Sequence, residues 1–209
     1  MAISFDTAQG YGASGSGSPT RTCSFTVGTG SNRLLVVAIY SSALSGLTYN
    51  GVAMTKIGHS FFESLELWYL LDPDEGTHDM VATSSGNFAF NPSIYIGSYF
   101  GVEDIDNSVT QEDGGTNSAT ITLTTVADNC WLIMAGFADN GGPVGAGADT
   151  VVRATNNGYG GLLDSNSVKT PAGSDSLNYT GNGHMYGVMA SFSPASDPPA
   201  DTSKFFSVM

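Results

Sequence analysis

Residues 65–80, LELWYLLDPDEGTHDM, contain the pattern that decides the fold. The apolar block LELWYLL has the length of a strand, and alternate side chains of a strand lie on opposite faces of a sheet. In the acidic turn that follows, Pro73 presets φ and Gly76 supplies a positive φ. From His78 onward polar and apolar residues alternate, as in a returning strand. The stretch therefore predicts two strands joined by a hairpin loop, with the acids at its solvated tip.

Segments of strand length recur along the chain. The segment RTCSFTV alternates and places Cys23, Phe25 and Val27 on one face, whereas NRLLVVAIYSS is continuously apolar, as in a central strand covered on both faces. No segment of about 11 residues has a 3.6-residue apolar period with caps. We therefore predict an all-β protein, an antiparallel two-sheet β-sandwich of jelly-roll-like form with about 10–12 strands and little or no helix.

The chain of 209 residues is long enough to bury a substantial core in one domain. We expect a single β-sandwich domain over residues 1–195 and an extended tail over residues 196–209, SDPPADTSKFFSVM. Prolines and small polar residues make the first part of the tail a spacer that does not pack. Its apolar end can insert into a partner's groove or sheet edge, or it can be a disordered end. The candidate contacts are Phe205, Phe206, Val208 and Met209.

The charge balance and the lengths of the apolar runs argue against two classes of partner. Six Lys and Arg oppose nineteen Asp and Glu, which gives a net charge of −13. There is no basic patch to neutralise phosphates, so we expect no nucleic-acid binding. No apolar run reaches about 18 residues, so we expect no membrane insertion. The start, MAISFDTAQG, lacks the pattern of a secretory signal.

Two acidic stretches are candidate cation sites. The acids between residues 72 and 76 do not have the alternating register of a calcium-binding loop. The second stretch, from Glu103 to Asn107, follows a strand and has a D-x-D-N order, so Asp104 and Asp106 form the better calcium candidate. The alternative is an ordinary polar loop. We otherwise expect no metal and no cofactor.

No residues form a catalytic constellation. Glu63 and Glu66 are strand acids in an aromatic setting, but alternation sends them to opposite faces, so they do not form the carboxylate pair of a glycosidase. Glu66 and Trp68 share a face, which we interpret as a solvated one. Cys23 and Cys130 fit no zinc motif and are expected to be small buried hydrophobes, although a disulfide between them stays open.

Aromatic side chains are candidate sugar contacts because the flat face of a sugar stacks on Trp or Tyr rings. Trp68 and Tyr159 are the two candidate glycan contacts, and the alternative for each is a place in the core. Tyr159 lies between glycines in a loop, in the sequence GYGG, and it is therefore the residue to test first.

The order of segments resembles a domain found in bacteriophage virion proteins and bacterial surface proteins. The resemblance is carried by SNRLLVV, TYNGVAMTKIG, LWYLLDPDEGTHDMVATSS and SYFGVED, and it continues through ATITL, DNCWLIMAGFA and YGVMASFSP, so it covers most of residues 1–195. It implies a concanavalin-like or jelly-roll β-sandwich used for adhesion or assembly. It brings no catalytic residues.

Together, the resemblance and the acidic, helix-poor sequence predict a non-enzymatic structural protein of a bacteriophage virion. We expect a capsid decoration, head-fibre or tail accessory protein that binds neighbouring virion proteins and is present as a homo-oligomer or in many copies. Without a signal segment it would be made in the host cytoplasm and released by lysis. The competing hypothesis is a carbohydrate-binding or host-adhesion module that contacts a surface glycan. The sequence does not distinguish capsid from tail.

Overall fold

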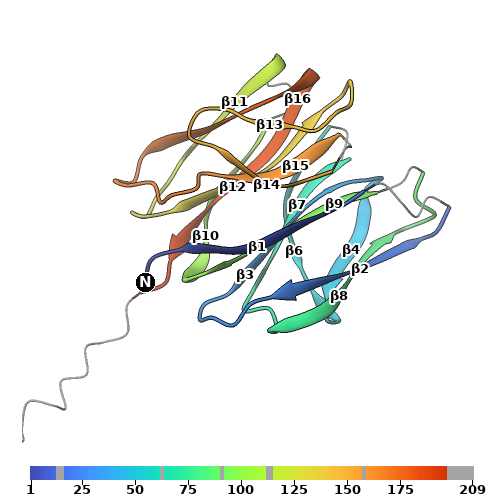
Figure 1. Cartoon of the computed structure of the whole chain (residues 1–209), viewed down its shortest axis with the longest axis horizontal. Helices are drawn as coiled ribbons and strands as arrows, with labels where there is room; N and C mark the ends of the chain where they lie inside the picture. Colours follow the sequence, from blue (N-terminus) through green and yellow to red (C-terminus); the bar gives the residue numbers. More distant parts are fainter. Residues whose placement is uncertain (13–16, 62–63, 90–91, 112–114, 157–158, 197–209) are drawn as a thin grey trace, which may run out of the picture.

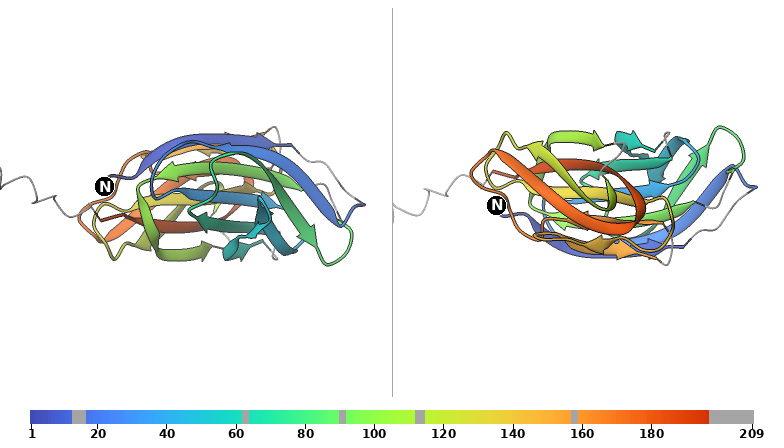
Figure 2. Two further views of the ribbon diagram at one scale, coloured as in Figure 1. Left: turned by 90° about the horizontal axis from the view of Figure 1, so that it is seen from below. Right: turned by 90° about the horizontal axis from the view of Figure 1, so that it is seen from above.

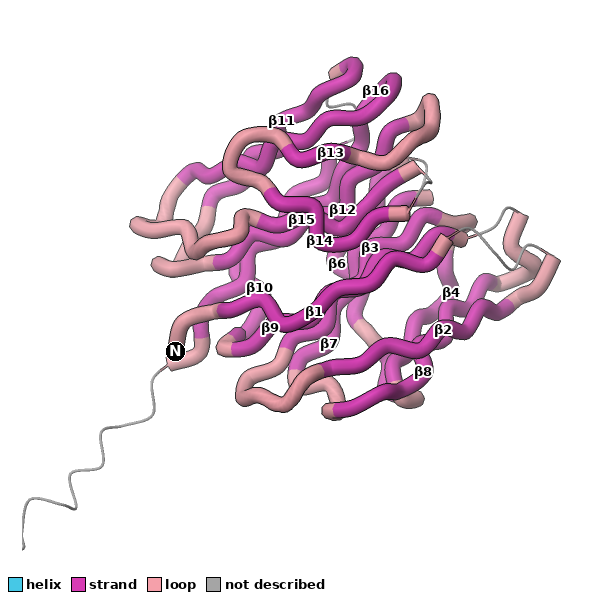
Figure 3. The backbone as a smooth tube through the Cα atoms, viewed as in Figure 1, coloured by secondary structure: helices cyan, strands magenta, loops and turns pink. Residues whose placement is uncertain are grey.

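The computed structural model describes residues 1–12, 17–61, 64–89, 92–111, 115–156 and 159–196. Within these ranges the chain consists of β-strands, turns and loops without helix, which confirms the predicted all-β antiparallel fold (Figure 1, Figure 3). No helix suited to crossing a bilayer occurs in this part of the chain. The strands are β1 (Ser4–Tyr11), β2 (Thr20–Val27), β3 (Leu34–Tyr40), β4 (Leu44–Tyr49), β5 (Val52–Ala53), β6 (Thr55–Ser60), β7 (Leu65–Leu71), β8 (Gly76–Ser84), β9 (Ser93–Phe100), β10 (Val102–Gln111), β11 (Thr116–Thr124), β12 (Trp131–Ala138), β13 (Gly145–Ala146), β14 (Val151–Thr155), β15 (Gly160–Asp164) and β16 (Ser174–Pro194).

The described strands form three antiparallel sheets where the sequence predicted two. The central sheet has the order β1-β9-β3-β7-β6. A four-stranded sheet, β2-β8-β4-β5, covers one of its faces, and a seven-stranded sheet with the path β10-β16-β12-β15-β14 covers the other (Figure 1). The long strand β16 pairs with β11 and β13 over its first half, which folds over the outside of the seven-stranded sheet as a further layer.

Three apolar cores hold these layers together. Leu34 and Val36 of β3 face the seven-stranded sheet, whereas Leu35 and Val37 face the four-stranded sheet, so β3 is buried on both faces as predicted. A third core, which includes Leu132 of β12, lies beneath the outer layer formed by β11 and β16. Alternation along one strand identifies its buried side chains but does not determine how many layers stack, so the predicted antiparallel β-sandwich is confirmed with three sheets in place of two.

The turn at residues 72–76 joins two sheets. β7 belongs to the central sheet and β8 to the four-stranded sheet, so the predicted hairpin is instead a corner between layers. Arg33 holds this corner, because its Nε donates to the Pro73 carbonyl at 2.7 Å and its guanidinium pairs with Glu75 at 2.9 Å. The positive φ expected at Gly76 is present. The turn residues determine the local backbone conformation, whereas the sheet that each strand joins depends on partners distant in sequence, β3 for β7 and β2 for β8.

The central and seven-stranded sheets also meet along both sides. On one side Asn156 Nδ2 donates to the Tyr11 carbonyl at 2.9 Å, and on the other Ser60 Oγ donates to the Gln111 carbonyl at 2.8 Å. The strands run along the long axis of the molecule (Figure 2). The central and seven-stranded sheets thus form a flattened barrel. The candidate site lies at one end of this barrel, where β1, β3, β6, β10, β12 and β14 all finish.

Candidate binding site at the aromatic end

Five aromatic rings of the described residues meet at this end, and we call the group the aromatic end. The central sheet contributes Tyr40, at the end of β3, and Phe61, just after β6. The other rings are Phe137 in β12, Tyr159 directly before β15, and Tyr186 in β16. Phe137 lies at the centre, with ring centroids 4.3 Å from Tyr40, 4.8 Å from Phe61, 6.0 Å from Tyr159 and 6.1 Å from Tyr186. Rings from the central sheet and from the seven-stranded sheet therefore close this end of the barrel.

Tyr159 is the exposed member of the aromatic end. Its side chain is 45% exposed, and no other Phe, Tyr or Trp in the described part of the chain is classed as exposed. Its carbonyl accepts a hydrogen bond from the Ala138 amide at 2.9 Å, which ties it to β12. A Cβ on Gly141, which has φ +80°, would lie 3.3 Å from Tyr159 Cε1. The ring is thus held by its neighbours while nearly half of it meets solvent.

The loops beside this ring are tied by hydrogen bonds. The amide of His184 donates to Asp139 Oδ1 at 2.8 Å, and the amide of Asp139 donates to the His184 carbonyl at 3.1 Å. The amide of Asn140 donates to the Asn182 carbonyl at 3.0 Å. The loop that includes Gly141 therefore has a bonded backbone, and it places amide and carboxylate groups beside the aromatic rings.

Tyr40 lies next to Tyr159, with ring centroids 5.9 Å apart. Burial raises the pKa of Tyr40, and the neighbouring Tyr159 hydroxyl adds to the rise. The Tyr40 phenol therefore stays protonated at neutral pH and can donate a hydrogen bond.

Trp68, the other predicted glycan contact, lies in the core between the central and four-stranded sheets. Its side chain is 7% exposed, so the prediction that it contacts a glycan was wrong. Its indole Nε1 donates to Glu66 Oε2 at 2.7 Å, and Lys56 Nζ lies 5.1 Å from the ring centroid. Strand alternation correctly predicted that Trp68 and Glu66 lie on the same face of the central sheet, but the four-stranded sheet covers that face.

Glu66 is the residue that the sequence interpretation missed. It was assigned to a solvated face, yet it is fully buried. Its Oε1 lies 2.7 Å from Lys56 Nζ and accepts a hydrogen bond from the Leu44 amide at 3.2 Å. Because Leu44 belongs to β4, this carboxylate connects the four-stranded sheet to the central one. The sequence did contain a signal for the burial of Glu66, because this acid lies inside a continuous apolar run. Glu63 lies outside the described residues.

The calcium candidate at Asp104 and Asp106 lies within β10, so the stretch is part of a strand and not the alternative polar loop. Asp106 Oδ2 accepts from the Val126 amide at 2.9 Å and from Ser191 Oγ at 2.8 Å, and its Oδ1 accepts from the Ala127 amide at 2.9 Å. Burial raises the pKa of Asp106, but these hydrogen bonds outweigh it and leave the pKa lowered.

The Asp104 carboxylate accepts a local hydrogen bond from the Ile105 amide at 2.7 Å, and the Asp104 carbonyl accepts from Ser193 Oγ at 3.2 Å. No group of three or more His, Cys, Asp and Glu side chains that could hold a metal ion occurs among the described residues. Asp106 is thus a structural acceptor for the turn before β12.

Cys23 lies in β2 and Cys130 directly before β12, and both are buried free thiols, so no disulfide joins them. Burial raises the pKa of Cys23 to about 11. Burial and the nearby Asp106 raise the pKa of Cys130 to about 12. The thiolate is the reactive form of cysteine, so neither side chain is poised as a nucleophile.

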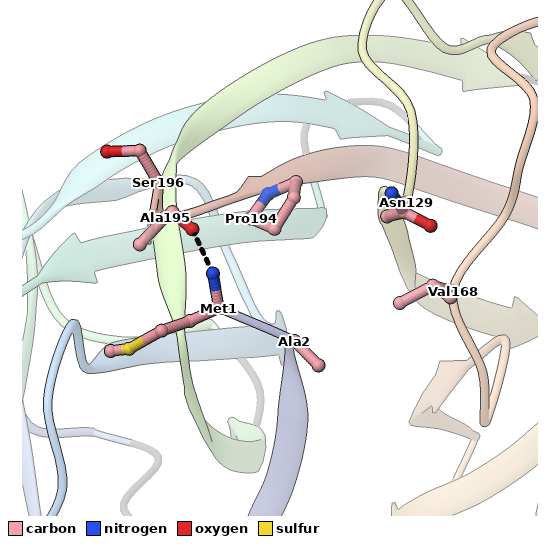
Figure 4. Close-up of a pocket in the computed structure, with 7 residues that line it drawn as sticks. All are labelled: Met1, Ala2, Asn129, Val168, Pro194, Ala195 and Ser196. Carbon is pink, nitrogen blue, oxygen red and sulfur yellow. Dashed lines mark hydrogen bonds between the residues drawn. The ribbon is translucent and has the colours of Figure 1, made fainter. Parts of the chain in front are cut away.

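A shallow hollow of about 450 Å³ lies at the opposite end of the barrel (Figure 4). The Met1 amine crosses it and donates to the Ala195 carbonyl at 2.5 Å. The side chains that line it include no Asp, Glu, His, Cys, Lys or Arg, so they supply no acid–base pair. The lining residues are Met1, Ala2, Asn129, Val168, Pro194, Ala195 and Ser196.

The predicted partner contacts Phe205, Phe206, Val208 and Met209 lie outside the described residues. The described chain leaves β16 at Pro194, and the Ala195 amide donates to the Gly101 carbonyl at 2.8 Å. The last described residue, Ser196, is exposed.

No protein-family model and no curated protein matches the chain. Among solved structures, the chain is similar to the ANX2 ectodomain from Arabidopsis thaliana, with a TM-score of 0.24 and 8% identity over 91% of this chain and 86% of that chain. Another structure, of the plant receptor-like kinase ANX2, has a TM-score of 0.26 and 8% identity over 86% and 84% of the two chains. An anti-sigma factor domain-containing protein has a TM-score of 0.23 and 11% identity over 86% and 76%. Structural similarity at these TM-scores supports no inference about function.

Proposed function

We propose that this chain is a non-enzymatic structural protein of a bacteriophage virion that binds neighbouring virion proteins on a capsid or tail. The observation that carries the proposal is the ordered series SNRLLVV, TYNGVAMTKIG, LWYLLDPDEGTHDMVATSS and SYFGVED, which resembles the virion domain. These segments supply β3, the strands from β4 to β8, and the junction of β9 and β10. They are thus the framework of the central and four-stranded sheets, as expected for a family marked by its fold.

The charge distribution supports an assembly role with a basic partner surface. Of the six Lys and Arg, three pair with acids within 2.9 Å, and Arg21 donates to backbone carbonyls of Pro92 and Gly12. Each pair removes one cation and one acid, so the remaining charged groups keep the excess of 13 negative charges, which disfavours nucleic acid and favours a complementary basic protein surface. The three pairs are Arg33–Glu75, Lys56–Glu66 and Arg153–Asp164.

The proposal is tested by the protein content of gradient-purified particles from the source of this chain. Quantitative mass spectrometry should find the chain at many copies per particle, and chemical cross-linking should join it to a capsid or tail protein. A chain that stays at the top of the gradient, separate from the particles, would show that the proposal is wrong.

A second candidate function is a carbohydrate-binding or host-adhesion module. The exposed, supported ring of Tyr159 favours it, because an aromatic side chain with a solvent-exposed surface is the element that a sugar-binding site needs. A glycan array with the intact protein tests it. Binding that disappears in Tyr159→Ala would favour adhesion, and an array without signal would exclude it for the glycans printed.

A further inference from the structure

We propose that the aromatic end binds an uncharged saccharide, with the Tyr159 ring as the stacking platform. The inference deepens the second candidate function and rests on it. Four observations carry it, namely the support of the ring, the hydrogen-bonding groups beside it, the sign of the surface charge and the size of the exposed surface.

The ring of Tyr159 is preorganised. Its plane lies at 25° to that of the buried Phe137 and at 37° to that of Tyr40, and Gly141 approaches its edge. A platform that is fixed before the ligand arrives loses little conformational entropy on binding. This distinguishes Tyr159 from an aromatic residue on an unsupported loop.

Polar groups suited to sugar hydroxyls lie in the same part of the fold. The exposed Thr155 ends β14, and its Oγ1 donates to the Gly160 carbonyl at 3.1 Å, so the hydroxyl oxygen can still accept a hydrogen bond. On the other side the exposed Asn140 adjoins Gly141, whose Cβ position faces the Tyr159 ring. An apolar ring with amide and hydroxyl groups around it offers both the stacking surface and the directional hydrogen bonds that a pyranose requires.

The charge decides the class of saccharide. The neighbouring carboxylate of Asp139 is half-buried and the net charge of the chain is −13. Four of the described cations are engaged elsewhere, in the pairs of Arg33, Lys56 and Arg153 and in the backbone contacts of Arg21. A sulfated, phosphorylated or sialylated sugar would be repelled, so the expected ligand is neutral.

The size of the exposed surface favours a sugar over a protein. Among the described rings of the aromatic end, Tyr159 is the exposed one, while Tyr40, Phe61 and Tyr186 are only partly exposed and Phe137 is buried. A stable protein–protein interface buries about 800 Å² on each partner. The surface of one exposed tyrosine ring is far smaller and suits contact with one or two sugar units.

The test uses the full chain and two glycan sets that differ only in charge. Neutral oligosaccharides and their sulfated or sialylated counterparts are printed on one array, and the best neutral hit is then titrated by NMR. We expect binding to neutral glycans alone, with chemical-shift changes at the Tyr159 ring and none at the buried Tyr179. Tyr159→Ala should weaken the affinity about tenfold, whereas Tyr159→Phe should retain most of it.

The matched control is Val126→Ala, which removes an exposed apolar side chain near the other end of β12 and should leave binding unchanged. Absence of binding to any neutral glycan up to about 10 mM, a preference for charged glycans, or equal affinity in Tyr159→Ala would overturn the site. Incorporation of Tyr159→Ala into particles is measured in parallel. Intact incorporation without sugar binding by the unaltered chain would refute the sugar site and leave the virion proposal standing.

Discussion

The ring of Tyr159 lies 6.0 Å from that of Phe137 at an angle of 25°, although Phe137 is only 1% exposed and Tyr159 is 45% exposed. An exposed residue is thus supported directly by a residue of the core between the central and seven-stranded sheets. This contact links the stability of the barrel to the position of the ring at its surface.

Shortening Phe137 should therefore affect both properties. We expect Phe137→Ala to lower the free energy of unfolding by about 3–5 kcal/mol because it leaves a cavity among the aromatic rings. Phe137→Leu should cost less, since it keeps more of the volume. Urea denaturation measures both variants, and Tyr159→Ala is the control, which should change stability far less. Equal losses for Phe137→Ala and Tyr159→Ala would contradict this description of the aromatic end.

The buried ion pair of β6 and β7 should stabilise the carboxylate that connects the central sheet to β4. Lys56→Met leaves the fully buried Glu66 carboxylate without its cation, and we expect a loss of about 3 kcal/mol. In a Glu66→Gln background the same substitution should cost much less, with a coupling energy of about 1 kcal/mol or more. Lys169→Met is the control for removing a positive charge and should have a small effect. A coupling energy near zero would mean that the pair contributes nothing to stability.

Asp106 should make stability depend on pH in a defined direction. Because its pKa is lowered in the folded state, its contribution is fully present above the unfolded value of about 3.9 and is lost as pH falls through the folded value. Asp106→Asn should be less stable than the unaltered chain by about 1–2 kcal/mol at pH 7, and this difference should shrink as pH falls through the folded value. Asp104→Asn is the control, with little expected change. A difference that stays constant down to low pH would refute this role.

The tail prediction concerns residues beyond the described chain. Removing residues 197–209 should leave the fold intact, since β16 ends at Pro194, but it should abolish incorporation into particles. Replacing Phe205 and Phe206 with Ser in the full chain should have the same effect, whereas replacing Pro198 and Pro199 with Ala should not. Circular dichroism and the protein content of purified particles measure the two properties. Unchanged incorporation of the truncated chain would show that its apolar end is not an attachment site.

Local sequence patterns predicted much of the fold. The alternation of RTCSFTV correctly buries Cys23, Phe25 and Val27, and the positive φ predicted at Gly76 is present. The flanking glycines also identified Tyr159 as a loop residue, and the structure shows it to be exposed.

The remaining features depend on contacts that local patterns do not encode. β7 and β8 are neighbours in sequence yet pair in different sheets, and the two halves of β16 belong to different layers. The exposure of Glu66 and Trp68 was therefore misjudged, because their face of the central sheet is covered by a sheet whose position depends on distant strands. The five rings of the aromatic end come from separate segments and could not be grouped in advance.

Cryo-electron microscopy of particles purified from the source of this chain tests the central claim most directly. We predict repeated density on the capsid or tail that accommodates the three stacked sheets of this chain, in contact with a neighbouring virion protein. A map in which every surface protein is accounted for by other chains would contradict the account.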